Sequence, residues 1–211
     1  MKQIIRITFS LVFLVSCNNS TKNKGEREFI PNPEKYALDE YLEINDSLKY
    51  KFTPDTLIGQ LSLNNTQNVN EYLGKDVMKK LIDDSLPYSS VTSKDGEQRL
   101  TFYFHPGNIV NTFSEFKVSY NNKKDRVEEV TSDRAFKTES GIELGMTEGD
   151  ILAIKGKPQN RVNNETTVFH YKIENMENSE FLKTYNMPVY YADYEFNNGY
   201  LIEFRFGFEY P

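Results

Sequence analysis

The chain has 211 residues, with 25 lysine and arginine side chains against 31 aspartate and glutamate side chains, which gives a formal net charge of −6. This acidic balance disfavours nucleic acid and anionic lipid as partners, because both need a basic surface. The length suffices for one large domain or two small ones, and a single cysteine excludes a framework of intramolecular disulfides.

The first sixteen residues have the three parts of a secretory signal peptide. Lys2 and Arg6 supply the positive start, the stretch 7–15 is mostly apolar, and the small residue Ser16 precedes the cleavage point. An apolar helix of that length spans only ~15 Å, about half of the hydrocarbon core of a bilayer. A permanent transmembrane helix is therefore the weaker interpretation, and we expect residues 1–16 to be removed.

The residues around the cleavage point resemble the lipobox of bacterial lipoproteins, with Leu14-Val15-Ser16 before Cys17. This resemblance implies a diacylglycerol on Cys17, and two acyl chains suffice for stable anchoring. The alternative is an ordinary signal peptide followed by a chance cysteine, which leaves an exported protein with an unexplained free thiol. No acidic run follows Cys17. We therefore expect a lipid-anchored cell-envelope protein, on the periplasmic face of the outer membrane.

After the signal peptide, the sequence predicts a tether and two related units. Residues 17–35 are polar and contain glycine and prolines, as is typical of a flexible linker. A short internal repeat then separates a first unit, 36–135, from a second unit, 136–211. The matching positions, 81 or 82 residues apart, are Leu63, Thr66 and Gly74-Lys75 in the first unit and Leu144, Thr147 and Gly156-Lys157 in the second. Coincidence is the alternative, because the match is short.

Each unit is predicted to begin with a short helix and to continue with strands. In the second unit, Thr147 and Asp150 form a capping box, and Gly156 and Pro158 end the helix. Asn198-Gly199 is a typical hairpin turn. The expected strands are 98–105, 113–120 and 126–131 in the first unit, and 167–172, 189–196 and 200–210 in the second.

The helix-and-turn motif of the second unit resembles the BamE family (SmpA/OmlA) of small outer-membrane lipoproteins. The residues that carry the resemblance are 141–147, Asp150-Ile151, Gly156-Lys157-Pro158, Phe169 and Tyr171. The β-lactamase inhibitor protein shares this broad fold as a tandem of two units. The resemblance implies an α+β fold of two repeated units, each with short helices packed on an antiparallel sheet. It transfers no functional residue, because BamE proteins have one unit and the inhibitor has disulfides that this chain cannot form.

Residue patterns that signal catalysis or metal binding are weak in this sequence. His105 and His170 occupy comparable strand positions, but no H-x-H, H-x3-H or HExxH spacing is present. Gly156-Lys157-Pro158 lacks the glycine and the Ser or Thr of a phosphate-binding loop. We therefore expect no cofactor, no metal and no catalytic residue. A hydrolase with paired carboxylates stays open as an alternative, because nothing among 31 acidic residues singles out a pair.

The aromatic residues of 189–210 alternate with polar ones, which predicts a sheet with one buried face. The residues expected on the buried face are Tyr190, Ala192, Tyr194, Phe196, Tyr200, Ile202, Phe204, Phe206, Phe208 and Tyr210. The residues expected on the opposite face are Tyr191, Asp193, Glu195, Glu203, Arg205 and Glu209. An ordinary solvated face is one interpretation. The other is a protein-binding surface, with Tyr191 and Arg205 of the types that often anchor interfaces.

These observations favour a membrane-anchored, non-catalytic protein-binding or assembly module of the cell envelope. An inhibitor of a periplasmic enzyme would use the same surface and is the first alternative, and an envelope-polymer hydrolase is the second. The oligomeric state stays open. Three tripeptides, at Asp46, Asp55 and Asp84, also resemble the Asp-Ser/Thr-apolar acceptor of a periplasmic O-glycosylation system, although Asp-Ser is ordinary turn chemistry as well.

Overall fold

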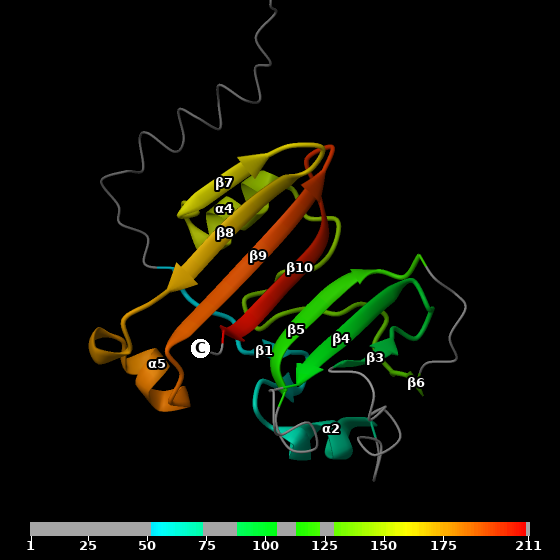
Figure 1. Ribbon diagram of the computed structural model, residues 1–211. Helices are drawn as coiled ribbons and strands as arrows, with labels where there is room; N and C mark the ends of the chain where they lie inside the picture. Colours follow the sequence, from blue (N-terminus) through cyan, green and yellow to red (C-terminus); the bar gives the residue numbers. More distant parts are fainter. Residues whose placement is uncertain (1–51, 74–87, 105–112, 123–128, 210–211) are drawn as a thin grey trace, which may run out of the picture.

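The computed structural model describes residues 52–73, 88–104, 113–122 and 129–209 (Figure 1). The signal peptide, Cys17, the predicted tether, His105 and Tyr210 lie outside these residues. No helix among the described residues is long and apolar enough to cross a membrane.

One eight-stranded sheet dominates the fold (Figure 1). In spatial order its strands are β6 (Glu129–Val130), β3 (Tyr88–Thr92), β4 (Gln98–Phe104), β5 (Phe113–Tyr120), β10 (Tyr200–Glu209), β9 (Val189–Asn197), β8 (Thr167–Ile173) and β7 (Asn160–Asn163). All neighbours are antiparallel except the short β3–β6 pair. A small hairpin of β1 (Leu57–Ile58) and β2 (Leu61–Ser62) precedes it.

The expected fold class, α+β with two repeated units, is wrong. Strands hold far more of the described residues than helices do, and the helices α2 (Thr66–Leu73), α4 (Glu148–Lys155), α5 (Glu180–Tyr185) and the 3-10 turn η2 (Met176–Asn178) are short. Strands β3 to β5 form one antiparallel meander and strands β7 to β10 form a second. Their last strands, β5 and β10, pair over five residues instead of remaining free edges. An unpaired edge strand leaves backbone N–H and C=O groups without partners, and the β5–β10 pairing satisfies these groups on both strands. This pairing joins the two meanders into one sheet. The division at residue 135 stays a prediction about the sequence repeat.

Helix α4 begins and ends where the sequence predicts. The Thr147 side chain accepts a hydrogen bond from the Asp150 amide at 3.2 Å, and the Asp150 carboxylate accepts one from the Thr147 amide at 2.8 Å. The Thr147 hydroxyl also donates to the Asp150 carboxylate at 2.7 Å, and the bonds from the Thr147 hydroxyl and amide lower the pKa of Asp150, because they favour the charged carboxylate. Gly156 ends the helix at φ 73°, a backbone conformation that a side chain disfavours. The predicted capping box is confirmed.

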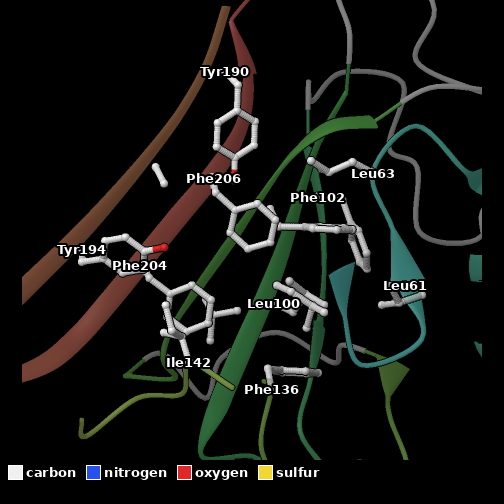
Figure 2. Packing of buried hydrophobic residues seen from close by; sticks show 14 of the residues in the cluster. Leu61, Leu63, Leu100, Phe102, Phe136, Ile142, Tyr190, Tyr194, Phe204 and Phe206 are labelled. Carbon is white, nitrogen blue, oxygen red and sulfur yellow. The ribbon is translucent and has the colours of Figure 1, made fainter. Parts of the chain in front are cut away.

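The core lies on one face of the sheet and runs through both meanders. Figure 2 shows Phe206 of β10 and Phe102 of β4 in the same layer, with Ile142 beside Phe204. Rings of neighbouring strands meet edge to face, for example Phe116 and Phe206 at 5.7 Å between centroids. Ile142 belongs to the segment before α4, so the core joins residues on both sides of the predicted unit boundary.

The predicted alternation is right for β9 and only partly right for β10. The four inward residues of β9, at positions 190, 192, 194 and 196, are buried, and so are Phe204, Phe206 and Phe208. At the start of β10, however, Leu201 is buried, Tyr200 is 57% exposed and Ile202 is half-buried. The register shifts between Leu201 and Glu203, which turns Leu201 inward in place of its neighbours.

Candidate functional site

The sheet has a second face, opposite the core, on which every alternate side chain points away from the aromatic layer. In Figure 1, helix α4 lies behind β7 and β8, on the core side. We call the exposed side the open face. Its residues include Tyr103 on β4, Glu115 and Lys117 on β5, Glu203, Arg205 and Glu209 on β10, Tyr191, Asp193 and Glu195 on β9, and His170 and Lys172 on β8.

All six residues predicted for this face lie on it. Five of them are half-buried and Glu209 is exposed. The register brings them side by side, since Arg205 pairs with Asp193 on β9 and with Lys117 on β5. The sequence pattern therefore identified the face correctly on β9 and on the second half of β10.

The open face is organised around a carboxylate that the sequence did not single out. The Glu115 side chain is only 8% exposed. Its two oxygens accept hydrogen bonds from different residues, Oε1 from Arg205 Nε and Oε2 from the Tyr191 hydroxyl. Bonds to a charged acceptor in a dry site are the strong ones. Together with Tyr103, these residues form what we call the Arg205 cluster.

Gly207 makes this arrangement possible, because it lies between Glu115 and Tyr191 in the register of the sheet. A Cβ atom at position 207 would lie 2.2 Å from the Ser114 carbonyl oxygen and 2.6 Å from the Glu115 Cα. Only glycine fits there. Without a side chain in between, the Tyr191 hydroxyl reaches across β10 to the carboxylate on β5.

The guanidinium of Arg205 lies close to two tyrosine rings. Its Cζ is 4.7 Å from the centroid of Tyr103 and 5.9 Å from that of Tyr191, both within cation–π range. Burial lowers the pKa of Arg205, but the hydrogen bond and charge of Glu115 outweigh it and raise the pKa overall. Burial, together with the charge of Glu115, raises the pKa of Tyr191 well above its ordinary range. Arg205 is therefore charged and Tyr191 is a neutral donor at physiological pH.

Ion pairs surround the Arg205 cluster on both sides. Lys117 lies 2.9 Å from Glu203, His170 Nδ1 lies 2.5 Å from Asp193, and Lys172 lies 3.6 Å from Glu209. Exposed pairs of this kind contribute at most ~1 kcal/mol each to stability. Lys117 offsets Glu203 and Lys172 offsets Glu209, but the open-face residues named above include five carboxylates against three lysine and arginine side chains, so this face carries an excess of negative charge.

His170 has a structural partner in Asp193, and the described residues contain no group of three His, Cys, Asp or Glu side chains arranged to hold a metal ion. His105, the other histidine, falls outside the part of the chain that the structure describes. Among the described residues, the side chains that meet on the open face thus support recognition by charge and stacking.

A second polar cluster lies in the interior, beneath the aromatic layer. Lys155 and Asp55 form an ion pair at 2.8 Å with both side chains 1% exposed. Lys155 also donates to the Thr53 carbonyl, and Ser140 donates to Asp55 at 2.9 Å. This pair ties the first described segment to helix α4. It also engages the aspartate of the Asp55-Thr56 tripeptide, while the Thr56 hydroxyl donates to Glu139 at 3.2 Å.

Sequence reasoning missed Glu115, Lys117, Tyr103 and Gly207. One signal was present: Gly207 interrupts an aromatic strand, and a glycine inside a strand often marks a close backbone approach. The alternation of Glu115 and Lys117 with phenylalanine and valine in 113–120 was a second signal. Neither signal reveals that β5 lies next to β10, which is a long-range pairing.

No family model matches the chain, and no curated protein or solved structure is significantly similar to it. The resemblance to the BamE family therefore stays a prediction.

Proposed function

We propose that this protein is a lipid-anchored lipoprotein of the cell envelope that binds another protein through the open face of its sheet. The Arg205 cluster is the observation that carries the proposal. Tyr and Arg are among the residue types most often found at the energetic centre of interfaces, and here the Arg205 guanidinium lies within cation–π distance of both Tyr103 and Tyr191.

Rigidity favours binding, because side chains that are ordered beforehand lose little entropy on association. Glu115 fixes Arg205 and Tyr191 from below, and its own position is fixed by its burial between β4 and β10. The half-buried aromatic and charged side chains at the centre therefore form a preformed surface. Their mixed charge fits a protein partner better than a polyanion, which needs a basic footprint.

The size of the open face is consistent with a modest interface. Five central strands at ~4.8 Å spacing and about seven residues per strand form a patch on the order of 500 Å². A standard interface buries ~800 Å² per partner. A partner seated on the Arg205 cluster thus also contacts the loops at the ends of the strands, or it binds weakly and reversibly.

Site-specific photo-crosslinking in intact cells tests this proposal. A photoreactive amino acid replaces His170 on the open face in one variant and Ala153, an exposed residue of α4 on the core side, in the control. We expect a discrete crosslinked protein from position 170 and none from position 153. Equal crosslinking from both positions, or none from 170 in the membrane fraction, would contradict the proposal. Identification of the crosslinked protein as an enzyme would favour the inhibitor alternative.

A further inference from the structure

The guanidinium of Arg205 has one edge that the Arg205 cluster leaves to solvent. Its Cζ lies within cation–π distance of the rings of Tyr103 and Tyr191, and its Nε is bonded to Glu115. The Arg205 side chain is nevertheless 40% exposed. Within the described part of the chain the Arg205 hydrogen bond is made by Nε, which leaves the donors of the terminal fork of two Nη groups for other acceptors.

Glu115 balances the charge of Arg205 but accepts a hydrogen bond from only one of its N–H donors. Arginine presents five N–H donors in a planar fork, of which the hydrogen bond to Glu115 uses the one on Nε. Both carboxylate oxygens of Glu115 are engaged, because Oε2 accepts from Tyr191. The remaining donors of Arg205 therefore need acceptors from water or from a ligand.

We propose that the Nη fork of Arg205 binds the carboxylate of a glutamate or aspartate side chain on the protein partner. This inference rests on the proposed function and names the chemistry of its central contact. A carboxylate matches the fork with two parallel hydrogen bonds.

The neighbouring acidic residues permit this contact, because each already has a positive or donating partner. Asp193 is paired with His170, and Glu203 is paired with Lys117. On the two sides of Arg205, an incoming carboxylate therefore finds Glu203 offset by the charge of Lys117 and Asp193 engaged in a hydrogen bond with His170. A phosphate group with two negative charges gains less, because the cluster offers a single fork and no second free cation among the described residues of its centre.

Arginine side-chain NMR on the full mature protein in detergent tests the contact. The probes are a blocked tripeptide, acetyl-Ala-Glu-Ala-amide, its glutamine counterpart, and acetyl-Ala-Gln-Ala with a free carboxyl terminus. We expect the Nε signal of Arg205 to shift and saturate with the glutamate peptide, with a dissociation constant on the order of millimolar, and to stay unshifted with the blocked glutamine peptide. Arg205→Lys, which keeps the charge but loses the fork, should weaken peptide binding at least about tenfold.

Equal shifts from the blocked glutamate and glutamine peptides, or no shift of Arg205, would overturn the inference. Tighter binding of the free carboxyl terminus than of the glutamate side chain would overturn the assignment to a side chain. These outcomes leave the proposed function intact if position 170 still crosslinks a protein in cells. If position 170 crosslinks no protein in intact cells, by contrast, the proposed function itself is contradicted.

Discussion

Replacing Gly207 with alanine should push strands β5 and β10 apart where the two meanders pair. The added Cβ would lie 2.2 Å from the Ser114 carbonyl oxygen, 2.6 Å from the Glu115 Cα and 2.9 Å from the Glu115 Cβ. Two of these atoms belong to the backbone of β5 and cannot rotate away. Strands β5 and β10 must therefore separate locally, which also moves the Glu115 carboxylate away from Tyr191 and Arg205.

The magnitude follows from two contributions. Overpacking a well-packed site costs about 1–3 kcal/mol, and weakening the hydrogen bonds to a nearly buried carboxylate adds on the order of 1–2 kcal/mol. We therefore expect Gly207→Ala to lower the free energy of unfolding by about 2–4 kcal/mol, a large share of the 5–15 kcal/mol typical of a domain.

The assay is equilibrium unfolding in urea, with Gly149→Ala as the matched control. Gly149 lies in helix α4, where a Cβ would meet only the Thr147 Oγ1 at an ordinary 3.7 Å. Alanine is a better helix former than glycine, so this control should be neutral or stabilising by up to ~1 kcal/mol. If both substitutions shift the midpoint equally, or if Gly207→Ala costs under about 0.5 kcal/mol, the close approach of β5 and β10 is wrong.

Three further predictions concern the interior and the anchor. Asp55→Ala should cost about 3–5 kcal/mol in urea unfolding, because it leaves the Lys155 ammonium buried without its partner, and the apolar double variant Asp55→Leu/Lys155→Met should recover most of that loss; a single variant as stable as the double would contradict this. The Tyr194 hydroxyl is buried without a hydrogen-bond partner among the described residues, so Tyr194→Phe should stabilise by up to ~1 kcal/mol. Burial raises the pKa of Tyr194 well above 10. Above about pH 10 this tyrosine therefore loses its proton in the unfolded chain before it does in the folded one, and the free energy of unfolding falls. The free energy of unfolding of Tyr194→Phe should fall less steeply above about pH 10 than that of the wild type, and an equally steep fall would refute the assignment. Cys17→Ser should abolish labelling by a radioactive fatty acid and release the protein from the membrane fraction, and undiminished labelling would exclude the lipid.

Local patterns predicted those parts of the fold that depend on neighbouring residues. The capping box of Thr147 and the alternation of β9 act over a few residues, so the sequence reveals them. Strand β7 was missed because Asn160–Asn163 has one apolar residue, Val162, and Val162 is itself 41% exposed. Helix α5 was missed because it has six residues, too few to establish a helical period.

The fold class was mispredicted for a non-local reason. Nothing near Phe113–Tyr120 or Tyr200–Glu209 in the sequence indicates that these two strands pair, and this pairing converts two units into one sheet. The same pairing brings Glu115 to Arg205. The polar half of the site on β9 and β10 was therefore predictable, whereas the carboxylate that organises it was not.

Co-purification from the native envelope tests the central claim most directly, that the open face binds a protein through the Arg205 cluster. Two variants are needed, because Tyr191→Ala/Arg205→Glu leaves Glu115 nearly buried without its partners. The second variant, Glu115→Gln/Arg205→Met, removes both charges and keeps the interior neutral. Ala153→Glu, at an exposed position of helix α4, is the control. We predict that the protein crosslinked from position 170 co-purifies with wild type and the Ala153 variant and is lost from both Arg205 variants. An undiminished complex with folded Glu115→Gln/Arg205→Met would contradict the claim.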